Sequence, residues 1–147
     1  LLCAGAAPRG VAAAAIVGVV LASAFHTQMV IAALGAAGAA VPFDRRLAMT
    51  GDDLIGLLPQ FGAVIAIALA IGFLVAAGLR RVLKPLAGIA YPLAGAAAIG
   101  VALTAMSMAF DGITPIAGAR STLGFGLQCL AGALGGLVFS TIAVRPK

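Results

Sequence analysis

Four long apolar stretches, separated by short polar connections, follow one another along the chain. None of them contains an Asp, Glu, Lys or Arg, and each is long enough to cross the roughly 30 Å hydrocarbon core of a bilayer as a helix. Because backbone groups in lipid must be paired within their own element, such stretches are predicted to be helices. The predicted spans cover residues 11–30, 54–79, 86–110 and 121–144.

The composition agrees with a membrane environment. Hydrophobic residues make up 63% of the 147 residues and charged residues only 9%, well below the roughly one quarter that is usual in soluble domains. The mean hydropathy is +1.21. No stretch shows the ten-residue alternation of barrel strands. We therefore predict an all-α fold, a polytopic transmembrane bundle of four spans in one integral-membrane domain over residues 1–147.

The connection between the first two spans departs from this pattern. Residues 29–41, MVIAALGAAGAAV, are apolar but too short to cross a membrane alone. They either extend the first helix, form a re-entrant hairpin or lie on the outer membrane surface, and Gly35 and Gly38 disfavour an uninterrupted helix. The polar stretch FDRRLAMTGDDLIG is expected to return the chain, with Thr50 or Asp52 capping the second helix. Pro92 is expected to kink the third span.

Basic residues are distributed unevenly between the connections. One side of the predicted bundle carries Arg9, Arg80, Arg81, Lys84, Arg145 and Lys147 without an acidic residue, and the other carries Asp44, Arg45, Arg46, Asp52, Asp53, Asp111 and Arg120. An excess of Lys and Arg in short loops marks the cytoplasmic side. Both termini are therefore predicted to face the cytoplasm from a multi-pass position in the inner membrane. The net charge of +5 then reports topology, and nucleic-acid binding is not expected.

Few polar residues lie within the spans, and polar groups at membrane depth are candidates for function. We consider His26, Gln28, Thr104, Ser107 and Gln128 as possible lining of a polar path or ligand contacts, with Asp111 and Arg120 at its outer mouth. A simpler interpretation is that His26 hydrogen-bonds to a neighbouring helix, and that Asp111 and Arg120 fix the turn between two spans.

The sequence carries none of the residue patterns of catalysis. His26 is the only histidine, so one chain supplies neither two histidines for a haem nor the ligands of a zinc site. No Ser or Cys within the spans is accompanied by a base and an orienting acid. We predict no catalytic residue, no metal, no cofactor and no enzymatic activity.

Small residues recur every four positions in the fourth span. Gly124, Gln128, Gly132, Gly136 and Ser140 form this ladder. Small residues at such spacing let helix backbones approach closely in lipid, and Gly lowers helix stability, so its recurrence indicates packing. The predicted packing surface comprises Gly124, Gly132 and Gly136, with Gly18 and Ala22 in the first span, and its partner is a helix of this chain or of another copy.

These patterns predict a small structural or accessory subunit that acts by helix packing in an oligomer or a larger membrane complex. Its expected partners are the lipid bilayer and either other membrane subunits or copies of itself. A homo-oligomeric transporter or channel for ions or small solutes is the alternative. A third possibility is a protein that binds a pigment, a quinone or a lipid with the help of His26.

Overall fold

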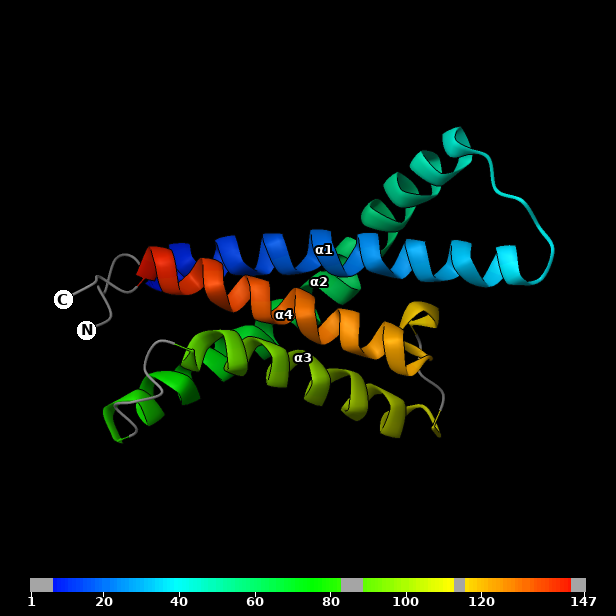
Figure 1. Ribbon diagram of the computed structural model, residues 1–147. Helices are drawn as coiled ribbons and strands as arrows, with labels where there is room; N and C mark the ends of the chain where they lie inside the picture. Colours follow the sequence, from blue (N-terminus) through cyan, green and yellow to red (C-terminus); the bar gives the residue numbers. More distant parts are fainter. Residues whose placement is uncertain (1–6, 83–88, 113–115, 144–147) are drawn as a thin grey trace.

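A computed structural model describes residues 7–82, 89–112 and 116–143, and over these residues the chain forms four long helices and one short 3₁₀ turn (Figure 1). The elements are α1 (Ala7–Ala36), α2 (Phe43–Val82), α3 (Ala90–Ala109), η2 (Ala117–Ala119) and α4 (Thr122–Ala143). Each α-helix contains a segment that is long and apolar enough to span a membrane. The predicted all-α bundle with four spans is therefore confirmed.

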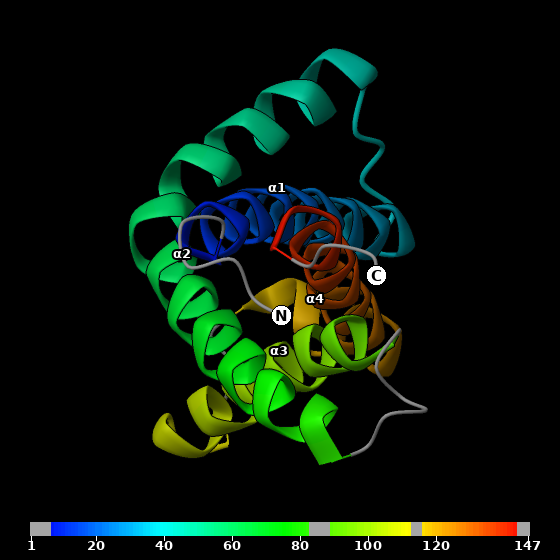
Figure 2. The same cartoon turned by 90° about the vertical axis from the view of Figure 1, so that its left-hand side faces the viewer.

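The helices pack in a ring in which α4 lies between α1 and α3, and α2 closes the opposite side (Figures 1 and 2). α1 begins and α4 ends at the same end of the bundle, which we call the terminal end; the opposite end is the distal end (Figure 1). Toward the terminal end, three aromatic rings fill the space between α2, α3 and α4. Phe139 stacks on Phe73 at 4.3 Å between ring centroids, and Tyr91 meets Phe139 edge-on at 4.8 Å.

Residues 29–36 continue α1 as a helix, so the first of the three possibilities for this segment is the one observed. The helix then ends in a Schellman motif. The amide N–H of Ala39 donates to the carbonyl of Leu34 and that of Gly38 to the carbonyl of Gly35, both at 3.0 Å. Gly38 has a φ of +85°, a left-handed conformation that glycine adopts without strain.

α2 begins at Phe43, so the expectation of a polar return loop with a cap at Thr50 or Asp52 is wrong. The Thr50 hydroxyl instead donates to the Arg46 carbonyl within the helix. At 40 residues α2 is about 60 Å long, twice the hydrocarbon thickness. Its membrane-length segment is Leu58–Val82. We call residues 43–58 the arm; it projects from the bundle at the distal end (Figure 1).

Two of the prolines within the helices, Pro59 and Pro92, have different consequences. Pro59 lies inside α2 next to the arm, where it cannot donate to the preceding turn, and α2 curves along the bundle in Figure 2. Pro92 lies in the first turn of α3, which begins at Ala90, so its missing N–H breaks no helical bond and the expected mid-span kink is wrong. Residues 86–88 of the predicted third span lie outside the described residues.

Candidate functional site

The glycine ladder of α4 is packed inside this chain. A Cβ atom placed on Gly132 would collide with the carbonyl oxygen of Gly95 in α3, and one placed on Gly136 would collide with the carbonyl oxygen of Tyr91. At the distal end, Gly124 lies against the carbonyl oxygen of Gly118. These contacts bring backbone directly against backbone, which only glycine permits. The ladder therefore holds helices of the same chain, and it is not free to receive a second copy.

The small residues of α1 face two different helices. A Cβ on Gly18 would lie 3.6 Å from side-chain atoms of Ile65 and Leu69 in α2, which is ordinary contact. Ala22 is buried, and its carbonyl oxygen accepts a hydrogen bond of 3.0 Å from Nε2 of Gln128 in α4. Gly18 thus lies against α2, whereas Ala22 marks the contact with α4.

Gln128 is the most deeply buried polar residue of α4, with 0% of its surface exposed. Its amide nitrogen joins α4 to α1 through Ala22, while its oxygen Oε1 is buried without a hydrogen-bond partner among the described residues. Ser140, at the other end of the ladder, donates to the Leu137 carbonyl of its own helix. Gln128 is therefore a contact between helices rather than a lining residue of an open path.

A polar cluster at the distal side of the bundle joins α1, α2 and η2. The Nδ1 atom of His26 accepts a hydrogen bond of 3.1 Å from the backbone N–H of Gly118. Its Nε2 atom lies 4.0 Å from Oδ2 of Asp53. The Thr27 hydroxyl is within donating distance of two acceptors, the same Oδ2 atom at 2.7 Å and the carbonyl oxygen of Ser23 at 3.0 Å. We call His26, Thr27, Asp53 and Gly118 the polar cluster; it links three segments that are far apart in the sequence.

The continued helices explain why these groups meet. α1 runs past residue 30, and the arm of α2 is helical, so Asp53 is carried along α1 to Thr27. Gly118 is required at its position because a Cβ there would lie 2.7 Å from the Cα atom of His26. While Nδ1 accepts from Gly118, the imidazole proton resides on Nε2, which is directed at the Asp53 carboxylate. His26 and Asp53 therefore face each other across 4.0 Å, which is an electrostatic contact and too long for a hydrogen bond.

Sequence reasoning missed Asp53 as a partner because it assigned the residue to a loop. A signal was present: Phe43, Leu47, Leu54 and Leu58 recur at helical spacing and predict a helix that carries Asp53 on another face. The pairing with Thr27 itself follows only from the antiparallel arrangement of α1 and α2.

The remaining candidates for a polar path do not join this cluster. Gln28 is exposed, and Thr104 is exposed with its hydroxyl donating to the Gly100 carbonyl of its own helix. Ser107 is half-buried on α3. Asp111, with a φ of +53°, and Arg120 are both exposed, and residues 113–115 between them lie outside the described part of the chain. His26 and Gln128 thus lie in the bundle, while Gln28 and Thr104 lie on its surface.

Replacing Thr27 with valine tests the polar cluster. Valine keeps the shape of threonine but leaves the Asp53 carboxylate without its 2.7 Å donor, so we expect the free energy of unfolding to fall by about 1.5–3 kcal/mol. Thr104→Val is the matched control, because that hydroxyl bonds only within its own exposed helical turn, and its effect should stay within about 0.5 kcal/mol. Denaturation in mixed detergent micelles measures both. Equal losses would contradict the proposed link between α1 and α2.

The grouping of metal-ligating side chains and three comparisons with known proteins bear on the kind of site. Among residues 7–82, 89–112 and 116–143, no group of three His, Cys, Asp or Glu side chains lies close enough to hold a metal ion. No protein-family model, no curated protein and no solved structure matches the chain.

Proposed function

We propose that this protein is a structural or accessory subunit of an inner-membrane assembly, and that it acts by helix packing. One observation carries the proposal: α4 is locked to α3 by backbone contacts at Gly132 and Gly136, and the rings of Phe73, Tyr91 and Phe139 fill the adjacent layer. A bundle closed in this way offers its outer faces to other molecules. These faces are where a packing subunit makes its contacts.

The outer faces of α2 and α3 are the most available. In the most apolar stretch of each span, 22% of α2 and 17% of α3 is buried in the bundle, against 39% for α1. Because the glycine ladder is already occupied within the chain, we place the assembly contacts on the more exposed faces of α2, α3 and the arm. The proposed contact surface therefore does not include the small residues of α4 that the sequence analysis singled out.

The arm provides a surface of its own. Phe43, Leu47 and Leu58 are 75%, 60% and 52% exposed, and they fall within about 60° of arc on one side of the helix. Arg45 and Asp52 lie on the opposite side by the same helical geometry. Such an exposed amphipathic helix beside a membrane is suited to contact another membrane subunit at the distal end.

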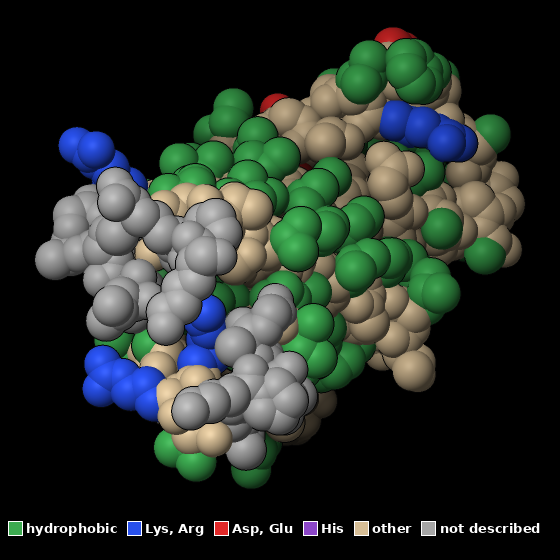
Figure 3. Space-filling model, turned by 60° about the vertical axis from the view of Figure 1, so that its left-hand side comes forward, with side chains coloured by type: hydrophobic (Ala, Val, Ile, Leu, Met, Phe, Trp, Pro, Cys, Tyr) green, Lys and Arg blue, Asp and Glu red, His purple; other side chains and the backbone are tan. Residues whose placement is uncertain are grey.

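The distribution of charge supports the proposed orientation. The terminal end carries Arg9, Arg80 and Arg81 without an acidic residue. At the distal end, the acidic residues of the arm and Asp111 after α3 are accompanied by Arg45, Arg46 and Arg120. In the view of Figure 3, the acidic side chains lie in the upper part of the molecule with one basic patch beside them, and the other basic side chains lie on the left. With positive residues retained inside, the terminal end faces the cytoplasm and the arm faces the opposite side of the inner membrane.

Gentle detergent extraction followed by native mass measurement tests the assembly. We expect stoichiometric foreign subunits, and we expect Leu47→Gln to reduce their recovery by about fivefold or more, the loss of roughly 1 kcal/mol of apolar contact. Ala48→Gln, on the polar side of the arm, is the control and should retain them. A pure homo-oligomer would count against an accessory subunit and would favour the transporter alternative.

A further inference from the structure

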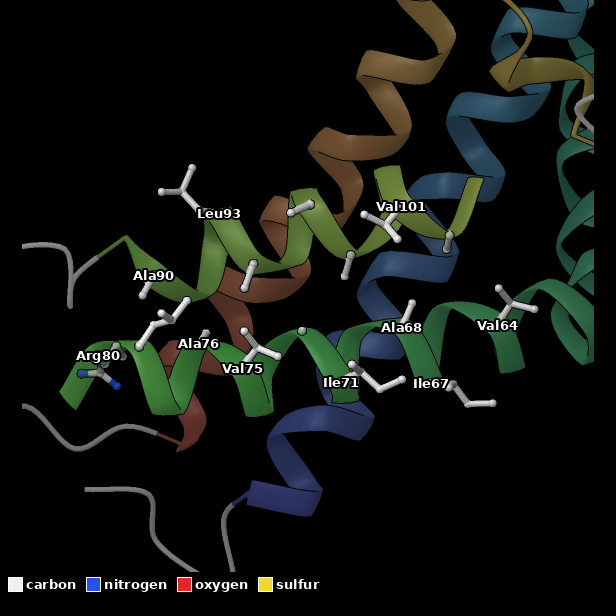
Figure 4. A pocket seen from close by; sticks show the side chains of 16 residues that line it. Val64, Ile67, Ala68, Ile71, Val75, Ala76, Arg80, Ala90, Leu93 and Val101 are labelled. Atoms are coloured by element: carbon white, nitrogen blue, oxygen red, sulfur yellow. The ribbon is translucent and has the colours of Figure 1, made fainter. Parts of the chain in front are cut away.

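A groove runs along the outside of the bundle between α2 and α3 (Figure 4). Its volume is about 710 Å³, and its lining extends from Val64 to Arg80 on α2 and from Ala90 to Ala102 on α3. Every lining residue except Arg80 is apolar or glycine. The groove is therefore an apolar depression on the lipid-facing surface, with a single charged group at one end.

The shape of the groove follows from where the two helices touch. At Gly72 an added Cβ would lie 3.0 Å from the Cβ of Ala98 and 3.1 Å from the carbonyl oxygen of Ala94, so α2 and α3 are in close contact there. Larger side chains stand along the edges: Ile71 is 58% exposed and Leu93 53%. Alanine in the floor between larger residues at the edges leaves a depression that another apolar chain can fill.

Arg80 lies at one end of the groove, with a cation–π contact but with one N–H group that lacks an acceptor. Its guanidinium carbon lies 4.9 Å from the centre of the Tyr91 ring, a cation–π contact that fixes the side chain beside the groove. Its Nε atom is buried and has no hydrogen-bond partner among the described residues. A buried N–H without an acceptor is costly in a membrane protein, and a guanidinium fits the oxygens of phosphate particularly well.

The chain supplies no acidic side chain that could neutralise Arg80. Asp44, Asp52 and Asp53 lie in the arm and Asp111 follows α3, all at the distal end, whereas Arg80 lies two residues before the terminal end of α2. Arg81 and Arg9 add positive charge at the same end. Since Leu58–Val82 is the membrane-length part of α2, Arg80 lies near the membrane surface, at the depth of lipid phosphate groups.

We propose that the α2–α3 groove binds an anionic glycerophospholipid, with one acyl chain along the alanine floor and the phosphate on Arg80. The groove extends along α2 for about 24 Å, longer than the roughly 15 Å of a single leaflet, so an acyl chain fits with its head group at Arg80. The clustered arginines favour an anionic head group over a zwitterionic one. This proposal does not rest on the assembly role, although both use the outer faces of α2 and α3, and His26 does not line the groove.

Lipid binding to the whole purified protein tests the site. Phosphatidylglycerol and phosphatidylcholine with the same acyl chains are titrated from mixed micelles, and bound lipid is counted by native mass spectrometry. Arg80→Gln should weaken phosphatidylglycerol binding by about 10- to 100-fold, the value of a charge-assisted hydrogen bond. Arg81→Gln removes the same charge from the exposed neighbouring residue, and it should cost about fivefold or less.

A second variant tests the position of the acyl chain. Ala97 lines the groove and is exposed, so Ala97→Phe fills the floor without disturbing the bundle. It should weaken the binding of both lipids by about tenfold or more while the unfolding midpoint stays unchanged, because it removes apolar contact along the chain. Unchanged binding in this variant would overturn the proposed groove.

Two further results would also overturn the proposal. Equal losses for Arg80→Gln and Arg81→Gln would mean that the lipid is attracted by diffuse charge alone. A groove covered by a second copy or a foreign helix, with no lipid retained, would make this face a protein interface. Retained lipid and its response to Arg80→Gln report the groove, whereas recovery of foreign subunits and its response to Leu47→Gln report the assembly role, so failure of one is distinguishable from failure of the other.

Discussion

Gly132→Ala is expected to lower the free energy of unfolding by at least about 3 kcal/mol, at or above the upper end of the usual cost of overpacking. The added methyl group would have to occupy the position of the Gly95 carbonyl oxygen and would also meet the Ile99 side chain at 2.6 Å. Because the obstacle is backbone, a side-chain rotation cannot relieve it, and α3 must move away from α4. The measurement is denaturation in mixed micelles, followed by the fluorescence of Tyr91, the only tyrosine in a chain without tryptophan.

Gly126 provides the matched control within the same helix. It is exposed, and no heavy atom lies within 4 Å of the position of an added Cβ. Gly126→Ala should therefore raise stability by about 0.5–1 kcal/mol through helix propensity. If Gly132→Ala and Gly126→Ala behaved alike, the backbone contact between α3 and α4 would have to be abandoned.

Phe139→Ala is expected to cost about 3 kcal/mol. Phe139 is 2% exposed and contacts the rings of both Phe73 and Tyr91, so its removal leaves a cavity where three helices meet. The value is at the low end for a buried phenylalanine, because lipid is itself apolar and the loss is mainly one of packing. The loss of unfolding free energy in Phe139→Ala therefore measures how closely the three rings pack rather than how hydrophobic they are.

Leu137→Ala is the corresponding control, since Leu137 lies two residues away and is 52% exposed. We expect it to change the free energy of unfolding by about 0.5 kcal/mol or less, as at other surface positions. The same micelle titration, read by circular dichroism, compares the two variants without relying on Tyr91. A Phe139→Ala protein as stable as Leu137→Ala would show that the aromatic layer does not hold α2, α3 and α4 together.

Both predictions bear on function, because they concern the layers that close the bundle. A transporter needs a path between its helices, whereas the contacts at Gly132 and Phe139 place backbone and rings there. The surfaces that we propose for partners are the arm and the outer faces of α2 and α3. The groove proposed to bind lipid lies between α2 and α3, and Arg80 marks the end at which the phosphate group would lie.

Part of the fold is readable from composition and length alone. Stretches of about 20 residues without charge are membrane helices because lipid cannot satisfy an open backbone, and this reasoning identified all four spans. It was less accurate at the connections. The arm was assigned to a loop because polar residues such as Arg46 and Asp53 interrupt its apolar pattern, although they occupy one side of a helix.

The sequence by itself therefore determined the class of fold, the number of spans and the glycines that permit close packing. Only the tertiary structure decided which surfaces these residues face: Gly132 against α3, Gly18 against α2, Asp53 beside Thr27, and Arg80 at the end of a groove. The physical reason is the solvent. In water an apolar stripe marks the inner face of a helix, but in lipid both faces are apolar, so periodicity does not give the rotation of a helix. That rotation is set by contacts between segments distant in the sequence.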